Sequence, residues 1–83
     1  MARINKNDFF EEENQASIEE QEFAISRYYL GTLNEEKIIQ INMYGSKYRK
    51  ETKPPHNHKT QVIQIDKDTA IILINLFKKH FNL

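Results

Sequence analysis

The stretch of sequence that decides the fold is residues 61–83, QVIQIDKDTAIILINLFKKHFNL. Its first residues alternate between polar and apolar, so Ile63 and Ile65 share one face of a predicted strand. Asp66 or Asp68 then follows in the position of a helix N-cap. From there a stripe at helical spacing is formed by Ala70, Leu73, Ile74, Phe77 and Phe81. The chain is therefore predicted to end in a strand that runs directly into an amphipathic helix.

The predicted helix is apolar over more of its surface than one side of a sheet requires. Three residues, Ile71, Ile72 and Leu76, lie beside or beyond the core stripe. A contiguous apolar surface of this kind marks a contact with another surface. That surface is either the N-terminal segment or a symmetry mate. We expect these three residues to form an oligomer interface and the protein to be a homodimer.

Residues 37–44 give the clearest strand upstream, because their side chains alternate with a period of two. The predicted core face of this strand carries Ile39, Ile41 and Met43. The opposite face, which we expect in solvent, carries Gln40, Asn42 and Tyr44.

The segment before this strand admits two interpretations. Ser17 and Glu20 resemble a capping box, which would begin a helix that ends at Gly31. We favour a strand over residues 23–33, because aromatic residues cluster there and a turn at residues 34–36 would return the chain antiparallel.

Together these elements predict an α+β fold, with a small antiparallel sheet of three to four strands packed by a C-terminal helix. Residues 1–22 are predicted to be an acidic N-terminal arm with room for a short helix. Residues 23–83 are predicted to be a single α+β domain. The length of 83 residues and the 39% of apolar residues are typical of one small globular domain.

Charge and cysteine content narrow the class of protein further. The chain has no cysteine, so no disulfide stabilises it, and its longest apolar run, residues 70–74, is too short for a membrane span. The N-terminus lacks the apolar core of a signal peptide, and we expect a cytoplasmic protein. The formal net charge is zero, but residues 1–36 carry 3 Lys/Arg and 9 Asp/Glu, whereas residues 37–83 carry 9 and 3.

Basic and aromatic residues follow the polar face of the strand at residues 37–44. Tyrosines stack on unpaired bases, amides bond to base edges, and lysines neutralise phosphates. The alternative interpretation is an ordinary solvated strand face beside a lysine-rich loop. We expect a site for single-stranded DNA or RNA made of Gln40, Asn42, Tyr44, Lys47, Tyr48, Arg49, Lys50, Lys53 and Lys59.

The order of elements resembles a known family. A hairpin, a basic segment around Lys47-Tyr48-Arg49, and a strand that leads through residues 66–68 into a C-terminal helix are similar to the single-stranded-DNA-binding transcriptional coactivators, positive cofactor four and its bacterial relatives. The same order is similar to a PUR-type repeat. The resemblance covers residues 23–81. It implies a curved antiparallel sheet backed by a helix, a dimer, and single-stranded nucleic acid on the sheet.

The runner-up is a protein-interaction module, such as a small regulator or inhibitor carried by a mobile element. It would meet its partner through the acidic arm at Phe9 and Phe10, or through the apolar flank of the helix.

Catalysis and metal binding have little support in the sequence. His56 and His58 lie near each other without an acidic or cysteine ligand beside them, so we expect no metal and no cofactor. Without a cysteine nucleophile, a nucleophile-elbow serine or a glycine-rich loop, we do not expect an enzyme.

Overall fold

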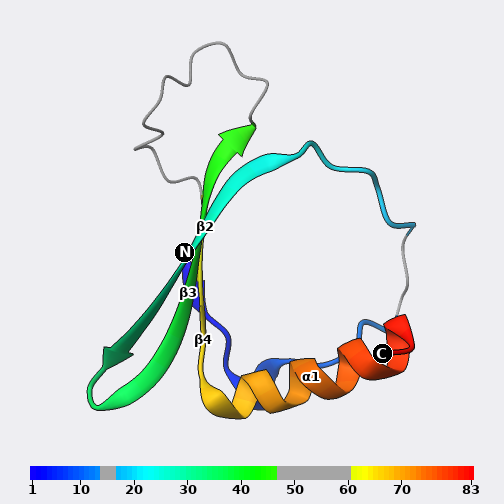
Figure 1. The fold of residues 1–83 in the computed structure, drawn as a ribbon. Coiled ribbons are helices and arrows are strands. Elements are labelled where there is room, and N and C mark those ends of the chain that lie inside the picture. The colour runs from blue at the N-terminus through cyan, green and yellow to red at the C-terminus, as the bar shows by residue number, and fades with distance from the viewer. Residues whose placement is uncertain (14–16, 47–60) are drawn as a thin grey trace.

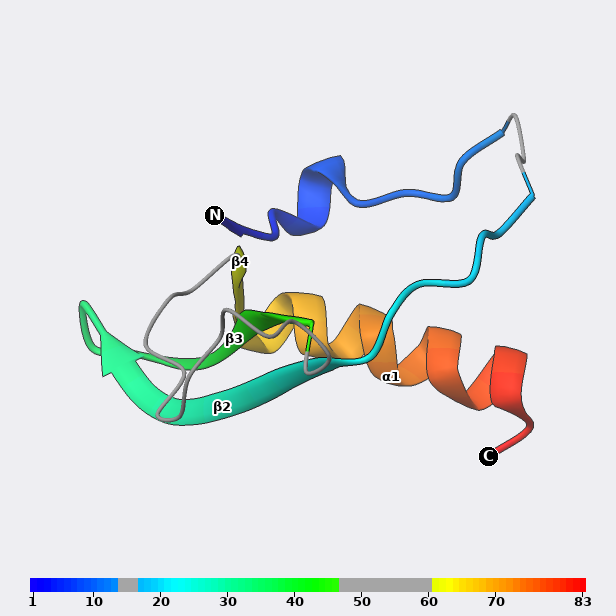
Figure 2. The same cartoon turned by 90° about the horizontal axis from the view of Figure 1, so that it is seen from above.

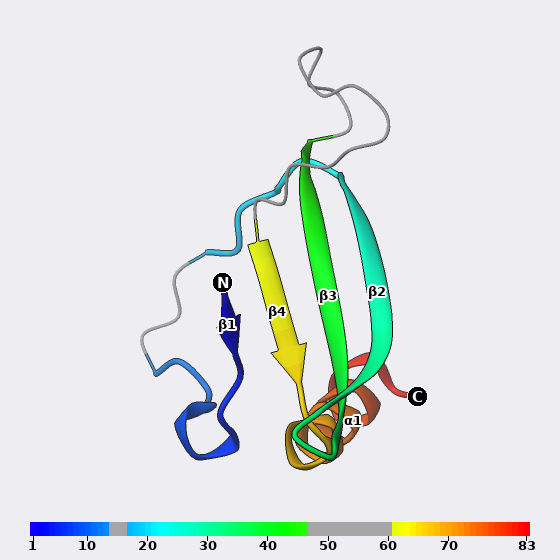
Figure 3. The same ribbon diagram turned by 90° about the vertical axis from the view of Figure 1, so that its left-hand side faces the viewer.

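The computed structural model describes residues 1–13, 17–46 and 61–83. Its elements, in chain order, are β1 (Ala2–Arg3), the 3₁₀-helix η1 (Lys6–Asp8), β2 (Ala24–Leu33), β3 (Glu36–Ser46), β4 (Gln61–Ile65) and α1 (Lys67–Phe81). The strands form one sheet in the order β1-β4-β3-β2 (Figure 3). Neighbours β2, β3 and β4 run antiparallel, whereas β1 runs parallel to β4. The predicted α+β fold is confirmed, and the additional strand β1 makes the sheet mixed.

A two-residue turn connects β2 to β3. Asn34 and Glu35 have φ angles of 51° and 66°, in the left-handed region, and Leu33 pairs with Glu36. Two consecutive left-handed residues are typical of the tight turns whose twist matches that of the flanking strands. The preferred interpretation of residues 23–33 as a strand is therefore confirmed, and the helical alternative is wrong.

The passage from β4 into α1 follows the sequence prediction. Asp66 is the N-cap, and its Oδ1 accepts a hydrogen bond of 2.9 Å from the Thr69 backbone N–H. The helix ends at Asn82, whose left-handed backbone lets its N–H donate to the Lys78 carbonyl. In Figure 1, α1 leaves the end of β4 and points away from the sheet. Of the described elements, α1 packs chiefly against η1 and not across the strands.

The N-terminal residues tie the sheet to the helix. The Ile4 N–H donates to the Gln64 carbonyl at 3.0 Å, and the Thr69 hydroxyl donates to the Ile4 carbonyl at 3.4 Å. The Arg3 guanidinium reaches Glu36 at 2.8 Å and Asp66 at 3.0 Å. The pKa of Asp66 falls to about 2, mainly because of the Thr69 N–H and also because of Arg3. The start of the predicted acidic arm is thus part of the folded sheet.

The two faces of the sheet differ from the prediction in burial. Asn42 and Tyr44, which we expected in solvent, are only 0% and 4% exposed, whereas Ile39, which we expected in the core, is 40% exposed. That part of the prediction is wrong. Because α1 points away from the sheet, it does not cover Ile39. On the other face, Asn42 and Tyr44 satisfy each other by a hydrogen bond, which makes their burial possible.

Candidate binding surfaces

The buried polar residues belong to a face that extends across all four strands, here called the polar sheet face. The register places Arg3, Gln64, Gln40 and Tyr29 in one row, from β1 through β4 and β3 to β2. The next row holds Val62, Asn42 and Arg27. Paired positions of neighbouring strands point to the same side of a sheet. The sheet therefore brings two arginines, two glutamines and two tyrosines together with Asn42 on one side.

Side-chain hydrogen bonds connect the middle of the polar sheet face into a chain. The Gln64 Nε2 donates to the Gln40 Oε1 at 3.0 Å, and the Gln40 Nε2 donates to the Asn42 Oδ1 at 2.9 Å. The Asn42 Nδ2 then donates to the Tyr44 hydroxyl at 3.2 Å. Gln40 and Asn42 each use one donor and one acceptor in this series and Gln64 uses one donor, so the three amides are oriented relative to each other.

Two exposed side chains lie beside this chain of hydrogen bonds. The Arg27 guanidinium carbon lies 5.5 Å from the centroid of the Tyr44 ring, at cation–π distance. Tyr29 is half exposed, and its pKa is raised, mainly by its hydrogen bond with Tyr44. Arg27 and Tyr29 are thus held by contacts with a buried tyrosine while they remain open to solvent.

The structure brings together some of the residues that the sequence predicted for nucleic-acid binding. Gln40, Asn42 and Tyr44 lie on one face as expected, with Gln40 the most accessible of the three. The remaining predicted residues lie outside the described part of the chain: Lys47, Tyr48, Arg49, Lys50, Lys53 and Lys59.

Sequence reasoning missed three members of this face, Arg3, Arg27 and Tyr29. The signal for two of them was present in the hairpin. A two-residue turn at residues 34–35 sets the pairing of β2 with β3, which places Arg27 opposite Asn42 and Tyr29 opposite Gln40. Arg3 gave no such signal, because a strand of two residues has no alternation to detect.

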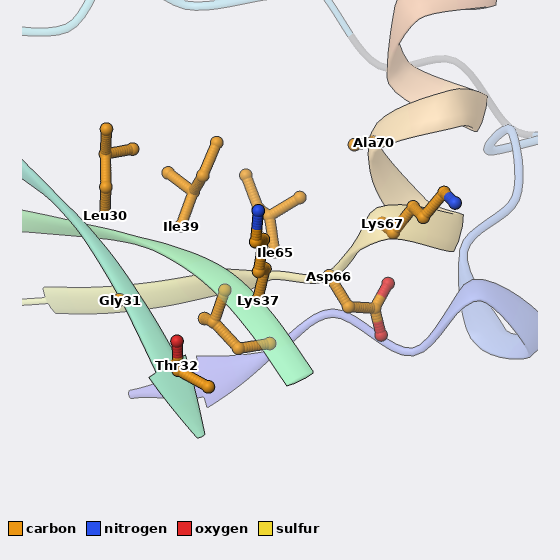
Figure 4. Close-up of a pocket in the computed structure, with 10 residues that line it drawn as sticks. Leu30, Gly31, Thr32, Lys37, Ile39, Ile65, Asp66, Lys67 and Ala70 are labelled. Atoms are coloured by element: carbon orange, nitrogen blue, oxygen red, sulfur yellow. The ribbon is translucent and has the colours of Figure 1, made fainter. Parts of the chain in front are cut away.

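An apolar groove lies on the other side of the sheet, where α1 begins. It has a volume of about 510 Å³. Figure 4 shows the side chains of Leu30, Ile39 and Ile65 pointing to the same side of the sheet, toward the space beside Ala70. The lining is completed by Lys37, Lys67 and Asp66 and by the hairpin residues Gly31, Thr32 and Ile38. This volume, here called the apolar groove, is open to solvent in a single protomer.

A second groove, of about 590 Å³, separates the N-terminal segment from α1. Phe9 and Phe10 line one side of it, and Ile72 and Leu76 line the other. Two of the three residues predicted as an oligomer interface therefore face the N-terminal segment of their own chain. Ile71 does not line this groove, and it is half exposed.

Comparison with known protein families, with curated proteins and with solved structures finds no match to the chain. The resemblance to the single-stranded-DNA-binding coactivators and to PUR-type repeats therefore stays a prediction. Within residues 1–13, 17–46 and 61–83, no three His, Cys, Asp or Glu side chains are grouped to hold a metal ion. His56 and His58 lie outside these residues. No helix in the described part of the chain has the length and apolar character needed to cross a membrane.

Proposed function

We propose that the protein is a small, non-catalytic module that binds single-stranded nucleic acid on the polar sheet face. The observation that carries this proposal is the exposed pair of Arg27 and Tyr29, both held against the buried Tyr44. An exposed aromatic ring next to a guanidinium is a platform on which an unpaired base stacks, with a cation in place for the adjacent phosphate.

The rest of the polar sheet face supplies the complementary contacts. Gln40 and Gln64 are half-buried amides in the same row as Tyr29, and each keeps part of its hydrogen-bonding capacity for a base edge. Arg3 lies at the end of that row, but Glu36 and Asp66 already bind its guanidinium, so Arg27 is the cation that this face offers to a phosphate. Because the hydrogen-bonded chain fixes the amides before a ligand arrives, little side-chain freedom is lost on binding.

The proposal is tested by fluorescence anisotropy with a labelled oligothymidine that is short enough to contact one sheet. Affinity should fall steeply as the salt concentration rises, because the release of counterions from the phosphates then contributes less free energy to binding. Tyr29→Ala should weaken binding by about fivefold or more, the size of one lost base–aromatic stack. Arg27→Lys keeps the charge but removes the planar guanidinium, so it should weaken binding less than Arg27→Ala.

The matched control is Tyr28→Ala. Tyr28 neighbours Tyr29 in β2 and is also exposed, but it points to the opposite face of the sheet. If no oligonucleotide binds at low salt, or if the Tyr28 and Tyr29 variants lose the same affinity, the polar sheet face is not a nucleic-acid site.

A second candidate function, a protein-interaction module acting as a small regulator, is favoured by the apolar groove. Leu30 and Ile39 are exposed there although they are aliphatic. If this is the function, a partner protein should stay bound to the chain after nuclease treatment. Leu30→Ser should abolish that binding, and Arg27→Ala should leave it unchanged. The reverse pattern would favour the nucleic-acid function.

A further inference from the structure

An acidic segment with two apolar residues lies between the N-terminal elements and β2. Residues 17–23 form neither helix nor strand, and all are exposed. Ile18 is 100% exposed and Phe23 is 75% exposed, and three glutamates lie between them. Figure 1 shows the segment bowing away from both the sheet and α1 before it enters β2. Figure 2 gives the same path from above. Two large apolar side chains are thus left in water.

The apolar groove has the opposite properties. In its lining Leu30 and Ile39 are exposed and Ile65 and Ala70 are half-buried. Two exposed lysines, Lys37 and Lys67, line it as well. Neither lysine takes part in an ion pair within the described part of the chain. The carboxylate in the lining, Asp66, is already bound by Arg3. The groove therefore combines an apolar floor with uncompensated positive charge, which suits an apolar segment rich in glutamate.

A protomer cannot cover this groove with both apolar side chains of its own segment. Phe23 adjoins Ala24, which pairs with Ser46 at the end of the hairpin far from the turn, whereas Leu30 lies near the turn. At a rise of about 3.4 Å per residue, Phe23 is about 24 Å from Leu30 along β2. If the chain turned straight back at Phe23, Ile18 would return about 17 Å of that distance and end about 7 Å from Leu30. Ile18 could then approach the groove of its own protomer, but Phe23 could not, so only a groove in another molecule can take both side chains.

We propose that residues 17–23 of a second copy of this chain occupy the apolar groove, and that the exchange is reciprocal. Ile18 and Phe23 of one protomer cover Leu30, Ile39 and Ile65 of the other, and the glutamates face Lys37 and Lys67. A two-fold axis allows both contacts of the exchange at once. If the two sheets face each other with their β2 strands antiparallel, the start of each β2 lies beside the end of the other. This assembly does not depend on the nucleic-acid function.

Cysteine cross-linking tests the exchange directly, since the native chain has no cysteine. Two chains of different mass, one carrying Phe23→Cys and the other Leu30→Cys, are mixed and oxidised. A disulfide-linked species containing one chain of each mass is expected. Phe10→Cys is the matched control, because Phe10 is 80% exposed and lies in the other groove. It should not cross-link to Leu30→Cys above background.

Sedimentation velocity over a range of concentrations supplies the second readout. The wild-type chain should be a dimer whose dissociation constant rises with salt. Phe23→Ser and Lys67→Glu should each raise that constant by about tenfold, whereas Phe10→Ser should leave it unchanged. Circular dichroism should show that both variants fold, because Phe23 and Lys67 are exposed in the protomer. A chain that stays monomeric, a dimer insensitive to Phe23→Ser, or equal cross-linking by Phe10→Cys would each overturn the proposal.

Discussion

The hydrogen-bonded chain under the polar sheet face makes a sharp prediction about Asn42. Its side chain is fully buried, accepts from the Gln40 amide at 2.9 Å and donates to the Tyr44 hydroxyl at 3.2 Å. Asn42→Ala removes both bonds and leaves a small cavity. Two lost bonds and a cavity of this size cost about 2–4 kcal/mol in the free energy of unfolding. A domain of this length has only roughly 4–12 kcal/mol in total.

The assay is urea denaturation followed by circular dichroism, at one fixed protein concentration because association shifts the midpoint. Asn75→Ala is the matched control, since Asn75 is an exposed asparagine in α1, and alanine there improves helix propensity slightly. Asn42→Ala should lower the midpoint strongly, and Asn75→Ala should leave it unchanged or raise it a little. Equal midpoints for the two variants would refute the idea that the buried hydrogen bonds of Asn42 stabilise the sheet.

Three further predictions concern other parts of the fold. Glu35→Gly should raise the free energy of unfolding by about 1 kcal/mol in thermal denaturation, because Glu35 has a left-handed φ of 66° that glycine adopts without strain; an unchanged or lower stability would contradict the turn geometry. Asp66→Asn should flatten the acid limb of the stability curve. The pKa of Asp66 is about 2 in the folded chain, against an ordinary value of 3.8. Its carboxylate therefore contributes stability that is complete above the ordinary pKa and is lost as the pH falls toward 2. Urea titrations across this pH range that show the same pH dependence for both proteins would contradict this prediction. Phe9→Ala should speed proteolysis of the N-terminal segment, because half-buried Phe9 lines the groove against α1, whereas Phe10→Ala should have less effect; equal rates would show that Phe9 does not anchor the segment.

The strand and helix at residues 61–83 could be predicted because their signals are local. Alternation sets β4, Asp66 caps α1 within three residues, and apolar spacing sets the helix. The hairpin was predictable for a similar reason, since the turn sits between two β-favouring runs. β1 could not be found, because two residues in a strand are held by backbone pairing with β4 and leave no pattern in the side chains.

The candidate site was predictable only in part. Over residues 39–44 alternation in β3 correctly separates the polar from the apolar side chains, but it does not tell which side is more buried. Burial depends on where α1 points after Asp66, which is a tertiary property. The sequence therefore wrongly predicted that Asn42 and Tyr44 are in solvent. Sequence reasoning also missed that Arg27 and Tyr29 belong to the site, because their role depends on their cross-strand neighbours.

The most direct test of the proposed function is an NMR titration that follows the side-chain amide signals of glutamine and asparagine. Gln40 and Gln64 point to the polar sheet face, whereas Gln61 lies in β4 on the opposite face. Addition of a short single-stranded oligonucleotide at low salt should shift the Gln40 and Gln64 signals and leave those of Gln61 and Asn75 in place. No shifts, or shifts confined to Gln61 and Asn75, would contradict a nucleic-acid site on the polar sheet face.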